Sequence, residues 1–297
     1  MREEIIFKSK GQQCRSWLYL PEDIESDAKL PAIVMAHGFS AVKEQALPEF
    51  AEKFSKAGYA TLLFDYRFFG ASEGEPRCQL FPLEMVEDYR NAISWVSEHP
   101  RVDRERICIW GTSYSGGLAS YVGAVDKRAK AVVAQVPSLI DPESRRMMDP
   151  VKWDSIGEFL LKDRIARYSS GAVNYIKVVA PEGEPCVLPG RENYDAFMEM
   201  ANIAPNWRNE VTLESLEKIR EFNPVSSIHW IAPRPLLVIA AENDNLLPLE
   251  VVKNSFDNAG EPKKLIVLPI LHFDIYSEPW LSKAASAATD WLNEYLK

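Results

Sequence analysis

Short apolar segments alternate along this chain with segments in which apolar residues recur every three or four positions. The run PAIVMAH (31–37) is typical of a strand buried on both faces, and the spacing in 47–58 is typical of a helix with one buried side. This alternation predicts a mostly parallel sheet with helices on both faces. The eight expected strands are residues 5–9, 14–21, 31–37, 59–67, 106–111, 129–137, 235–242 and 263–269. We expect the first two to form an antiparallel hairpin.

Residues 138–229 interrupt the alternation and are rich in charged residues, proline and aromatics. Helices are expected within this segment at 155–170 and 213–222. We therefore predict a core of residues 1–137 and 230–297, with 138–229 as an inserted helical cap over one edge of the sheet. The alternative is a side subdomain remote from any site.

The segment RICIWGTSYSGG (106–117) suggests a nucleophilic serine at a tight turn from strand to helix. Such a turn exposes the residue at its tip and needs small residues two positions before and two positions after it. Both Ser113 and Ser115 satisfy that spacing. Because the apolar run ends immediately before Gly111, we expect the tip at Ser113.

A serine hydroxyl needs a base to take its proton and a carboxylate to orient that base. Among the four histidines of the chain, His272 follows the last predicted strand, from which a loop can reach the edge of the sheet. Asp244 follows the preceding strand and is the preferred acid, with Glu242 and Asp274 as alternatives. The sequence therefore predicts that Ser113, Asp244 and His272 act together.

A tetrahedral oxyanion needs donors that are already in place, and backbone amides can supply them. One donor is expected to be the amide of Tyr114, directly after the nucleophile. The other is expected to be the amide of Phe39, in the loop after the strand that ends at His37. His37 and Gly38 are expected to shape that loop.

Together these residues resemble the α/β-hydrolase family, and the resemblance covers nearly the whole chain outside the predicted cap. It rests on motifs that occur in the family's order: HGF, FDYRFFGASEG, GTSYSGG, AENDNLLP and LHFDIY. Phe68 stands where the family usually has glycine. The length and HFDIY resemble the branch of dienelactone-hydrolase-like proteins and polyketide transferases. GTSYSGG resembles X-prolyl dipeptidyl aminopeptidases and cocaine esterases. The resemblance implies an α/β-hydrolase fold.

These patterns predict a serine hydrolase that cleaves a carboxylic ester or thioester through an acyl-enzyme. The alternatives are an acyltransferase similar to polyketide transferases and a hydrolase of carbon–carbon bonds. A peptidase acting on X-Pro bonds and a non-catalytic binding protein are less favoured. Four residues are expected to line a substrate pocket, namely Arg67, Trp153, Tyr175 and Trp207. The alternative for each of them is a structural role, in ion pairing or in packing.

The expected partner is a small-molecule acyl substrate, as the predicted activity implies. The formal charge of −9 and the absence of a basic run argue against nucleic acid. No apolar run approaches the roughly 18 residues of a membrane helix. The four cysteines are widely spaced, which is typical of reduced thiols in the cytoplasm. No cofactor or metal-binding motif is present, and a homodimer is left open.

Overall fold

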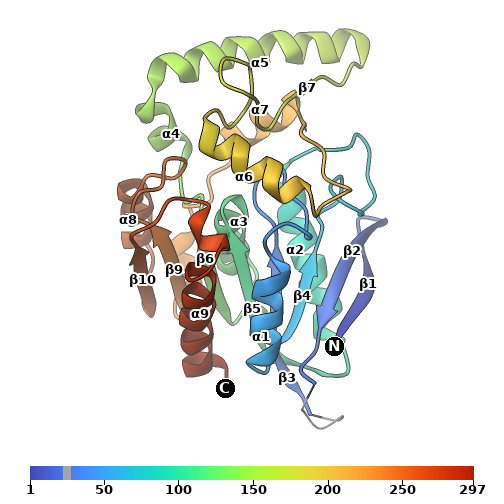
Figure 1. The fold of residues 1–297 in the computed structure, drawn as a ribbon, viewed down its shortest axis with the longest axis vertical. Coiled ribbons are helices and arrows are strands. Elements are labelled where there is room, and N and C mark those ends of the chain that lie inside the picture. The colour runs from blue at the N-terminus through green and yellow to red at the C-terminus, as the bar shows by residue number, and fades with distance from the viewer. Residues whose placement is uncertain (23–27) are drawn as a thin grey trace.

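The computed structural model describes residues 1–22 and 28–297, and this part of the chain contains an eight-stranded sheet (Figure 1). The strand order is β1-β2-β4-β3-β5-β6-β9-β10. Strand β2 runs antiparallel to both β1 and β4, and all other neighbouring strands of this sheet are parallel. This confirms the predicted number of strands and the antiparallel start. The bounds are β1 (Arg2–Ser9), β2 (Gln12–Tyr19), β3 (Leu30–Ala36), β4 (Ala60–Phe64), β5 (Val102–Thr112), β6 (Ala131–Gln135), β9 (Leu236–Ala241) and β10 (Lys263–Leu268).

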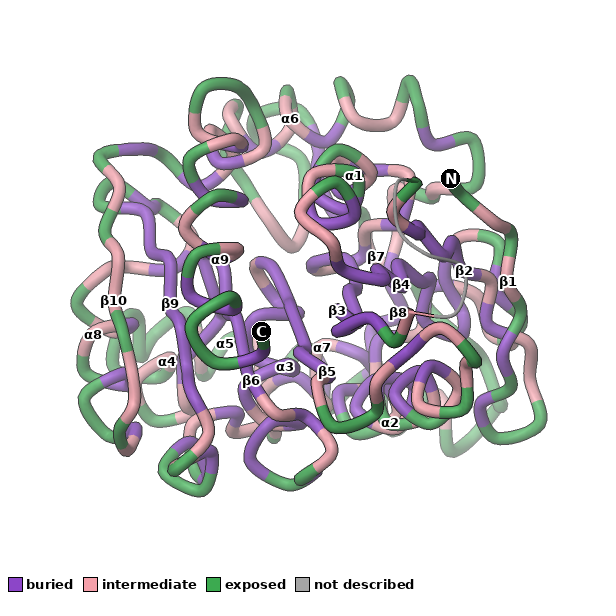
Figure 2. The backbone as a smooth tube through the Cα atoms, turned by 90° about the horizontal axis from the view of Figure 1, so that it is seen from below, coloured by how far each residue is buried: buried purple, intermediate pink, exposed green. Residues whose placement is uncertain are grey.

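Helices cover both faces of the sheet, because its central strands have apolar side chains on both sides. Every residue of β3, β4, β6 and β9 is buried (Figure 2). One face packs against α1 (Pro48–Lys56) and α9 (Trp280–Leu296). The other face packs against α2 (Pro82–Ser97), α3 (Tyr114–Val125) and α8 (Leu249–Asp257). In the described part of the chain, none of the helices has both the length and the hydropathy needed to cross a membrane.

Most of the inserted segment 138–229 lies beyond one edge of the sheet, at the top of Figure 1, while its two ends, at Leu139 and Ile228, pack into the core. The helices expected at 155–170 and 213–222 are present within α5 and α7, but the sequence analysis missed α4 and α6. Both missed helices are short, and α4 has no buried residue, so it lacks the apolar spacing that reveals a helix. The elements of the segment are α4 (Pro142–Met148), α5 (Pro150–Ser170), β7 (Tyr175–Ile176), α6 (Arg191–Ala201), β8 (Val211–Thr212) and α7 (Leu213–Glu221).

The aromatic packing of α1 on the sheet provides a test of the core. The ring centroid of Phe54 lies 6.2 Å from that of Trp110, and both side chains are fully buried. We expect Phe54→Ala to lower the free energy of unfolding by about 3–5 kcal/mol, because it removes apolar contacts and leaves a cavity. The control Leu83→Ala, at a residue 63% exposed, should change it by about 0.5 kcal/mol or less. Urea unfolding followed by circular dichroism measures both, and equal effects would contradict this packing.

Candidate active site

Ser113 is the only residue between β5 and α3, and its backbone conformation is strained. Its φ of 55° and ψ of −123° lie in a region that residues other than glycine rarely occupy. Neighbouring segments hold it there, since its amide donates to Gln135 O at 2.9 Å and its carbonyl accepts from Ser138 N at 2.8 Å. The turn is also crowded: a Cβ on Gly111 would lie 2.0 Å from the carbonyl oxygen of Ser115. The structure therefore places Ser113 at the tip of the turn.

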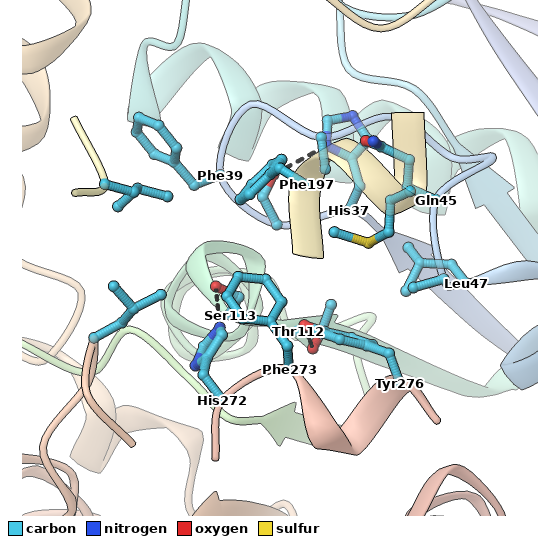
Figure 3. A pocket seen from close by; sticks show the side chains of 16 residues that line it. His37, Phe39, Gln45, Leu47, Thr112, Ser113, Phe197, His272, Phe273 and Tyr276 are labelled. Carbon is cyan, nitrogen blue, oxygen red and sulfur yellow. Dashed lines mark hydrogen bonds between the residues drawn. The ribbon is translucent and has the colours of Figure 1, made fainter. Parts of the chain in front are cut away.

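The side chains of Ser113, His272 and Asp244 meet at the carboxyl ends of β5, β10 and β9. His272 Nδ1 lies 2.7 Å from Asp244 Oδ2. His272 Nε2 lies 3.1 Å from Ser113 Oγ, a contact that Figure 3 shows as a dashed line. A carboxylate only accepts hydrogen bonds, so Nδ1 carries the proton and Nε2 is left to accept from the serine hydroxyl. Asp244 Oδ1 accepts the amides of Leu246 and Leu247 at 2.9 and 2.8 Å, which fixes the carboxylate in its loop.

The alternative nucleophile, Ser115, and the alternative acids, Glu242 and Asp274, do not contact His272 in this way. Ser115 is buried, and its hydroxyl donates to the carbonyl of His37 and hydrogen-bonds to the Tyr66 hydroxyl. Glu242 is exposed to solvent. Asp274 Oδ2 accepts the amide of Leu271 at 2.9 Å, within its own loop. The geometry thus brings together the three side chains that the sequence analysis preferred.

The loop after β3 runs directly beside Ser113. A Cβ on Gly38 would lie 3.0 Å from Ser113 Cβ, so any larger residue there would press on the serine. Within the residues that the structure describes, the amides of Phe39 and Tyr114 donate to no other protein group. Tyr114 is the first residue of α3, where amides have no acceptor within the helix. Both amides are therefore free to bind a ligand atom.

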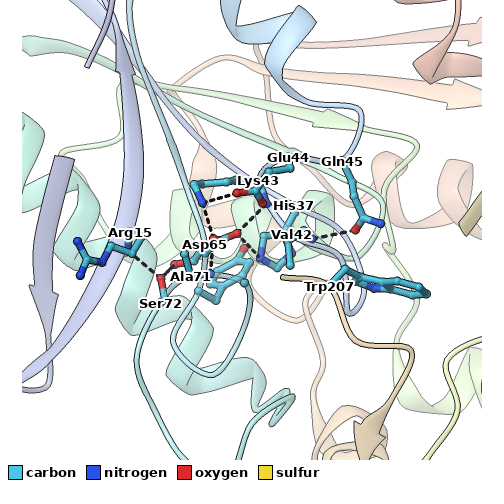
Figure 4. Close-up of polar contacts among 12 residues, drawn as sticks. Arg15, His37, Val42, Lys43, Glu44, Gln45, Asp65, Ala71, Ser72 and Trp207 are labelled. Carbon is cyan, nitrogen blue, oxygen red and sulfur yellow. Dashed lines mark hydrogen bonds and ion pairs between the residues drawn. The ribbon is translucent and has the colours of Figure 1, made fainter. Parts of the chain in front are cut away.

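A buried ion pair, which the sequence analysis did not identify, holds this loop from its inner side (Figure 4). Lys43 Nζ lies 2.8 Å from Asp65 Oδ2, and the amide of Lys43 donates to Asp65 Oδ1 at 2.7 Å. Burial alone would lower the pKa of the Lys43 ammonium, but Asp65 and Glu44 raise the pKa overall. The Lys43 ammonium therefore keeps its proton at neutral pH, and its contacts with Asp65 tie the loop that contains HGF to the motif DYRFFGASEG. The sequence signal for this ion pair was the lysine Lys43 in the loop that contains HGF and the aspartate Asp65 in the motif FDYRFFGASEG.

A mainly apolar pocket of about 440 Å³, a volume that includes its opening to solvent, lies between this loop, the histidine loop and the inserted segment (Figure 3). The inserted segment supplies three apolar side chains, Leu188, Phe197 and Met200. The remaining lining residues, from the rest of the chain, are His37, Gly38, Phe39, Ala41, Gln45, Ala46, Leu47, Thr112, Ser113, Leu246, His272, Phe273 and Tyr276.

The four residues predicted to line the substrate pocket do not line it. Arg67 is buried, and its Nε donates to Asp88 Oδ1 at 2.6 Å. Trp153 packs under the guanidinium of Arg220, 3.6 Å from the ring centroid, and Tyr175 is 40% exposed on β7. Trp207 lies behind the pocket wall, where it stacks on a lining residue. Aromatic or cationic character alone could not show which side of a segment each residue occupies.

His37 is neutral and structural in this arrangement. Burial lowers its pKa from 6.5 to about 4. Its Nδ1 lies 3.1 Å from the carbonyl oxygen of Gly38, which can only accept, so Nδ1–H is the donor. The ring also packs edge-on against Tyr66, with centroids 4.9 Å apart. These contacts support the expectation that His37 shapes the loop.

Comparison with known proteins shows clear relatives. The family profile described as X-Pro dipeptidyl-peptidase (S15 family) matches residues 10–159. The polyketide transferase ATR5 of Stachybotrys chlorohalonatus is 32% identical over 274 residues, which cover 90% of this chain and 88% of that protein. The thiohydrolase aneE of Aspergillus aculeatus is 33% identical over 262 residues, covering 86% and 80%. The crystal structure of the α/β hydrolase GrgF from Penicillium superposes with a TM-score of 0.85 at 27% identity, covering 100% of this chain and 99% of that chain.

The lowered pKa of His37 predicts a loss of stability in acid. Between pH 6.5 and about 4 the unfolded chain binds a proton at this residue that the folded chain does not, so falling pH favours unfolding. We expect this histidine to remove about 2 kcal/mol of unfolding free energy between pH 7.5 and pH 5. Urea unfolding measures the free energy of unfolding at both pH values. Its decrease from pH 7.5 to pH 5 should be smaller in His37→Gln than in the wild type by this amount. The exposed control His229→Gln should keep the wild-type dependence, and an unchanged dependence in His37→Gln would contradict the assignment.

Proposed function

Since the chain belongs to the α/β-hydrolase family, together with polyketide transferases and thiohydrolases, we propose that it is a serine hydrolase that cleaves a carboxylic thioester or ester. The observation that carries this proposal is the hydrogen-bonded series from Ser113 Oγ through His272 to Asp244, at 3.1 and 2.7 Å. A hydroxyl, a neutral imidazole and a carboxylate in this order activate the hydroxyl for attack on a carbonyl.

In the first half of the reaction Ser113 Oγ attacks the carbonyl carbon of the substrate, and His272 Nε2 takes the hydroxyl proton. The carbonyl oxygen becomes an oxyanion that accepts hydrogen bonds from the amides of Phe39 and Tyr114. When the tetrahedral intermediate collapses, the carbon–sulfur or carbon–oxygen bond breaks, and the leaving thiol or alcohol receives the proton from His272. The products are the released thiol or alcohol and an acyl ester on Ser113.

In the second half a water molecule attacks the acyl ester, with His272 Nε2 as the base that takes its proton. The oxyanion forms again at the same two amides. Collapse breaks the bond between the acyl carbon and Ser113 Oγ, which regains its proton from His272, and the carboxylic acid leaves. Every group that this scheme uses belongs to the chain itself, so the proposal requires no cofactor or metal.

The substrate that fits the pocket is a small molecule with an apolar acyl group. Phe39, Phe197 and Phe273 are among the lining residues, and most of the exposed surface of the pocket is apolar. Because Leu188 and Met200 also come from segment 138–229, we propose that this segment caps the acyl site. The unpaired state of all four cysteines supports a cytoplasmic location. The homodimer stays a prediction.

Acyl transfer to an alcohol is the second candidate, and the observation that favours it is the mainly apolar pocket beside Ser113, which is lined by Phe39, Phe197 and Phe273. Such a pocket restricts water at the acyl-enzyme stage and leaves time for another acceptor to attack. The relatives ATR5 and GrgF are both named polyketide transferases, which fits this alternative as well. Hydrolysis of a carbon–carbon bond, an X-Pro peptidase activity and a non-catalytic binding role are less favoured. Two relatives aligned along most of the chain are named a polyketide transferase and a thiohydrolase.

The role of Ser113 is tested by substitution and covalent labelling. We expect Ser113→Ala to lower kcat for p-nitrophenyl and thiophenyl esters by about 10⁴-fold or more, because the nucleophile is removed. The same variant should no longer react with a fluorophosphonate probe. The neighbouring control Ser115→Ala should still be labelled, and peptide mass spectrometry should place the label on Ser113. A Ser113→Ala enzyme with parental turnover would refute the proposal.

Transfer is distinguished from hydrolysis by product ratios. If the acyl-enzyme accepts alcohols, adding a primary alcohol to the thioester reaction should produce the ester at the expense of the acid, while release of the thiol continues. Liquid chromatography with mass spectrometry measures both products. Substituting Phe197→Ala should shift the ratio toward the acid by admitting water, and a product mixture independent of the alcohol would exclude transfer.

A further inference from the structure

Trp207 connects the inserted segment to the loop that follows β3. It lies in the connection between α6 and β8, where its Nε1–H donates to the carbonyl oxygen of Ser40 at 2.9 Å. The neighbouring residues Asn206 and Arg208 are exposed, whereas Trp207 is partly buried. A second bond runs the other way, from Ser40 Oγ to the carbonyl oxygen of Glu210 at 3.3 Å. Figure 4 shows Trp207 beside this loop.

The residue that Trp207 holds is strained and directly follows Phe39. Ser40 has a φ of 49°, in the left-handed region that residues other than glycine seldom occupy. Such a conformation persists only where surrounding contacts enforce it. The turn closes on itself weakly, through a bond of 3.4 Å from Ala41 N to Gly38 O. The bonds to the inserted segment therefore provide much of the restraint on the loop's outer half.

The ring of Trp207 also connects to the loop that contains His272. It stacks on Phe197 with centroids 5.7 Å apart and planes at 26°. Phe197 meets Phe273 edge-on at 5.9 Å, and Phe273 meets the ring of His272 at 5.1 Å. Trp207 thus belongs to a continuous series of contacts that runs from the loop after β3 to the ring of His272.

We propose that Trp207 is a positioning residue that holds the amide of Phe39 where the oxyanion forms, while its ring sets the spacing to the His272 loop. This inference rests on the proposed function. It assigns the inserted segment a second role besides lining the pocket, because the segment then also affects the rate of the reaction. Trp207 touches no reacting atom, so it acts through Ser40. Its removal should reduce stabilisation of the transition state and leave binding of the ground-state substrate nearly intact.

The test removes the donor and keeps the ring. Trp207→Phe retains an aromatic ring against Phe197, and benzothienylalanine installed at position 207 retains the indole shape with sulfur in place of N–H. We expect both to lower kcat for a p-nitrophenyl ester about tenfold, less than the 10²–10³-fold cost of losing an oxyanion donor itself. KM should stay within about twofold, and inhibition by a boronic acid that forms a tetrahedral adduct on Ser113 should weaken by the same factor as kcat/KM.

Trp230→Phe is the matched control, since Trp230 is 58% exposed and lies outside the inserted segment. It should show parental kcat and KM. Parental kcat in both Trp207 variants would overturn the inference, as would a rise in KM alone. A loss in Trp207→Phe with full activity in the benzothienylalanine enzyme would show that the ring packs without positioning, and would also overturn it. An unmodified protein that neither hydrolyses the ester nor reacts with a fluorophosphonate would instead overturn the proposed function on which the inference rests.

Discussion

The backbone of Ser113 imposes the constraint on which the surrounding structure depends. A single residue joins a strand to a helix, in a conformation that costs free energy, and the neighbouring strand and loop compensate through hydrogen bonds to its amide and carbonyl. The crowding extends to Gly111 and Gly38, where any side chain would collide with the turn or press on it. The sheet thereby holds the Ser113 hydroxyl in a fixed position. The loops after β3, β9 and β10 lie around it.

Those loops are fixed by different means. The carboxylate of Asp244 is anchored by two amides of its own loop, and it in turn orients His272. The loop after β3 has a buried ion pair, Lys43 with Asp65, on one side and the inserted segment on the other. A buried pair of this kind contributes little net stability, but losing one partner leaves an uncompensated charge. Its main effect here is to hold the loop in one conformation.

Much of the sheet and the central site could be predicted from the sequence, because both depend on local rules. Continuous apolar runs identify buried strands, and small residues around Ser113 identify a tight turn. The order of strand ends then identifies His272 and Asp244. The pocket could not be predicted in this way: Trp207 and Phe197 are both aromatic residues of the inserted segment, yet only Phe197 faces the cavity. Which side chain faces inward depends on the packing of short helices such as α6, whose periodicity is too brief to reveal a face.

The pocket wall supplied by the inserted segment comes from one short, contiguous stretch, between Leu188 and Met200. The strained turn at Ser113, the ion pair of Lys43 with Asp65 and the amides of Phe39 and Tyr114 all lie elsewhere in the chain. A change of bulk at Leu188 or Met200 would therefore reshape this wall while leaving the turn and the ion pair untouched. A change at Phe197 would also disturb its contact with Phe273, which packs against the ring of His272.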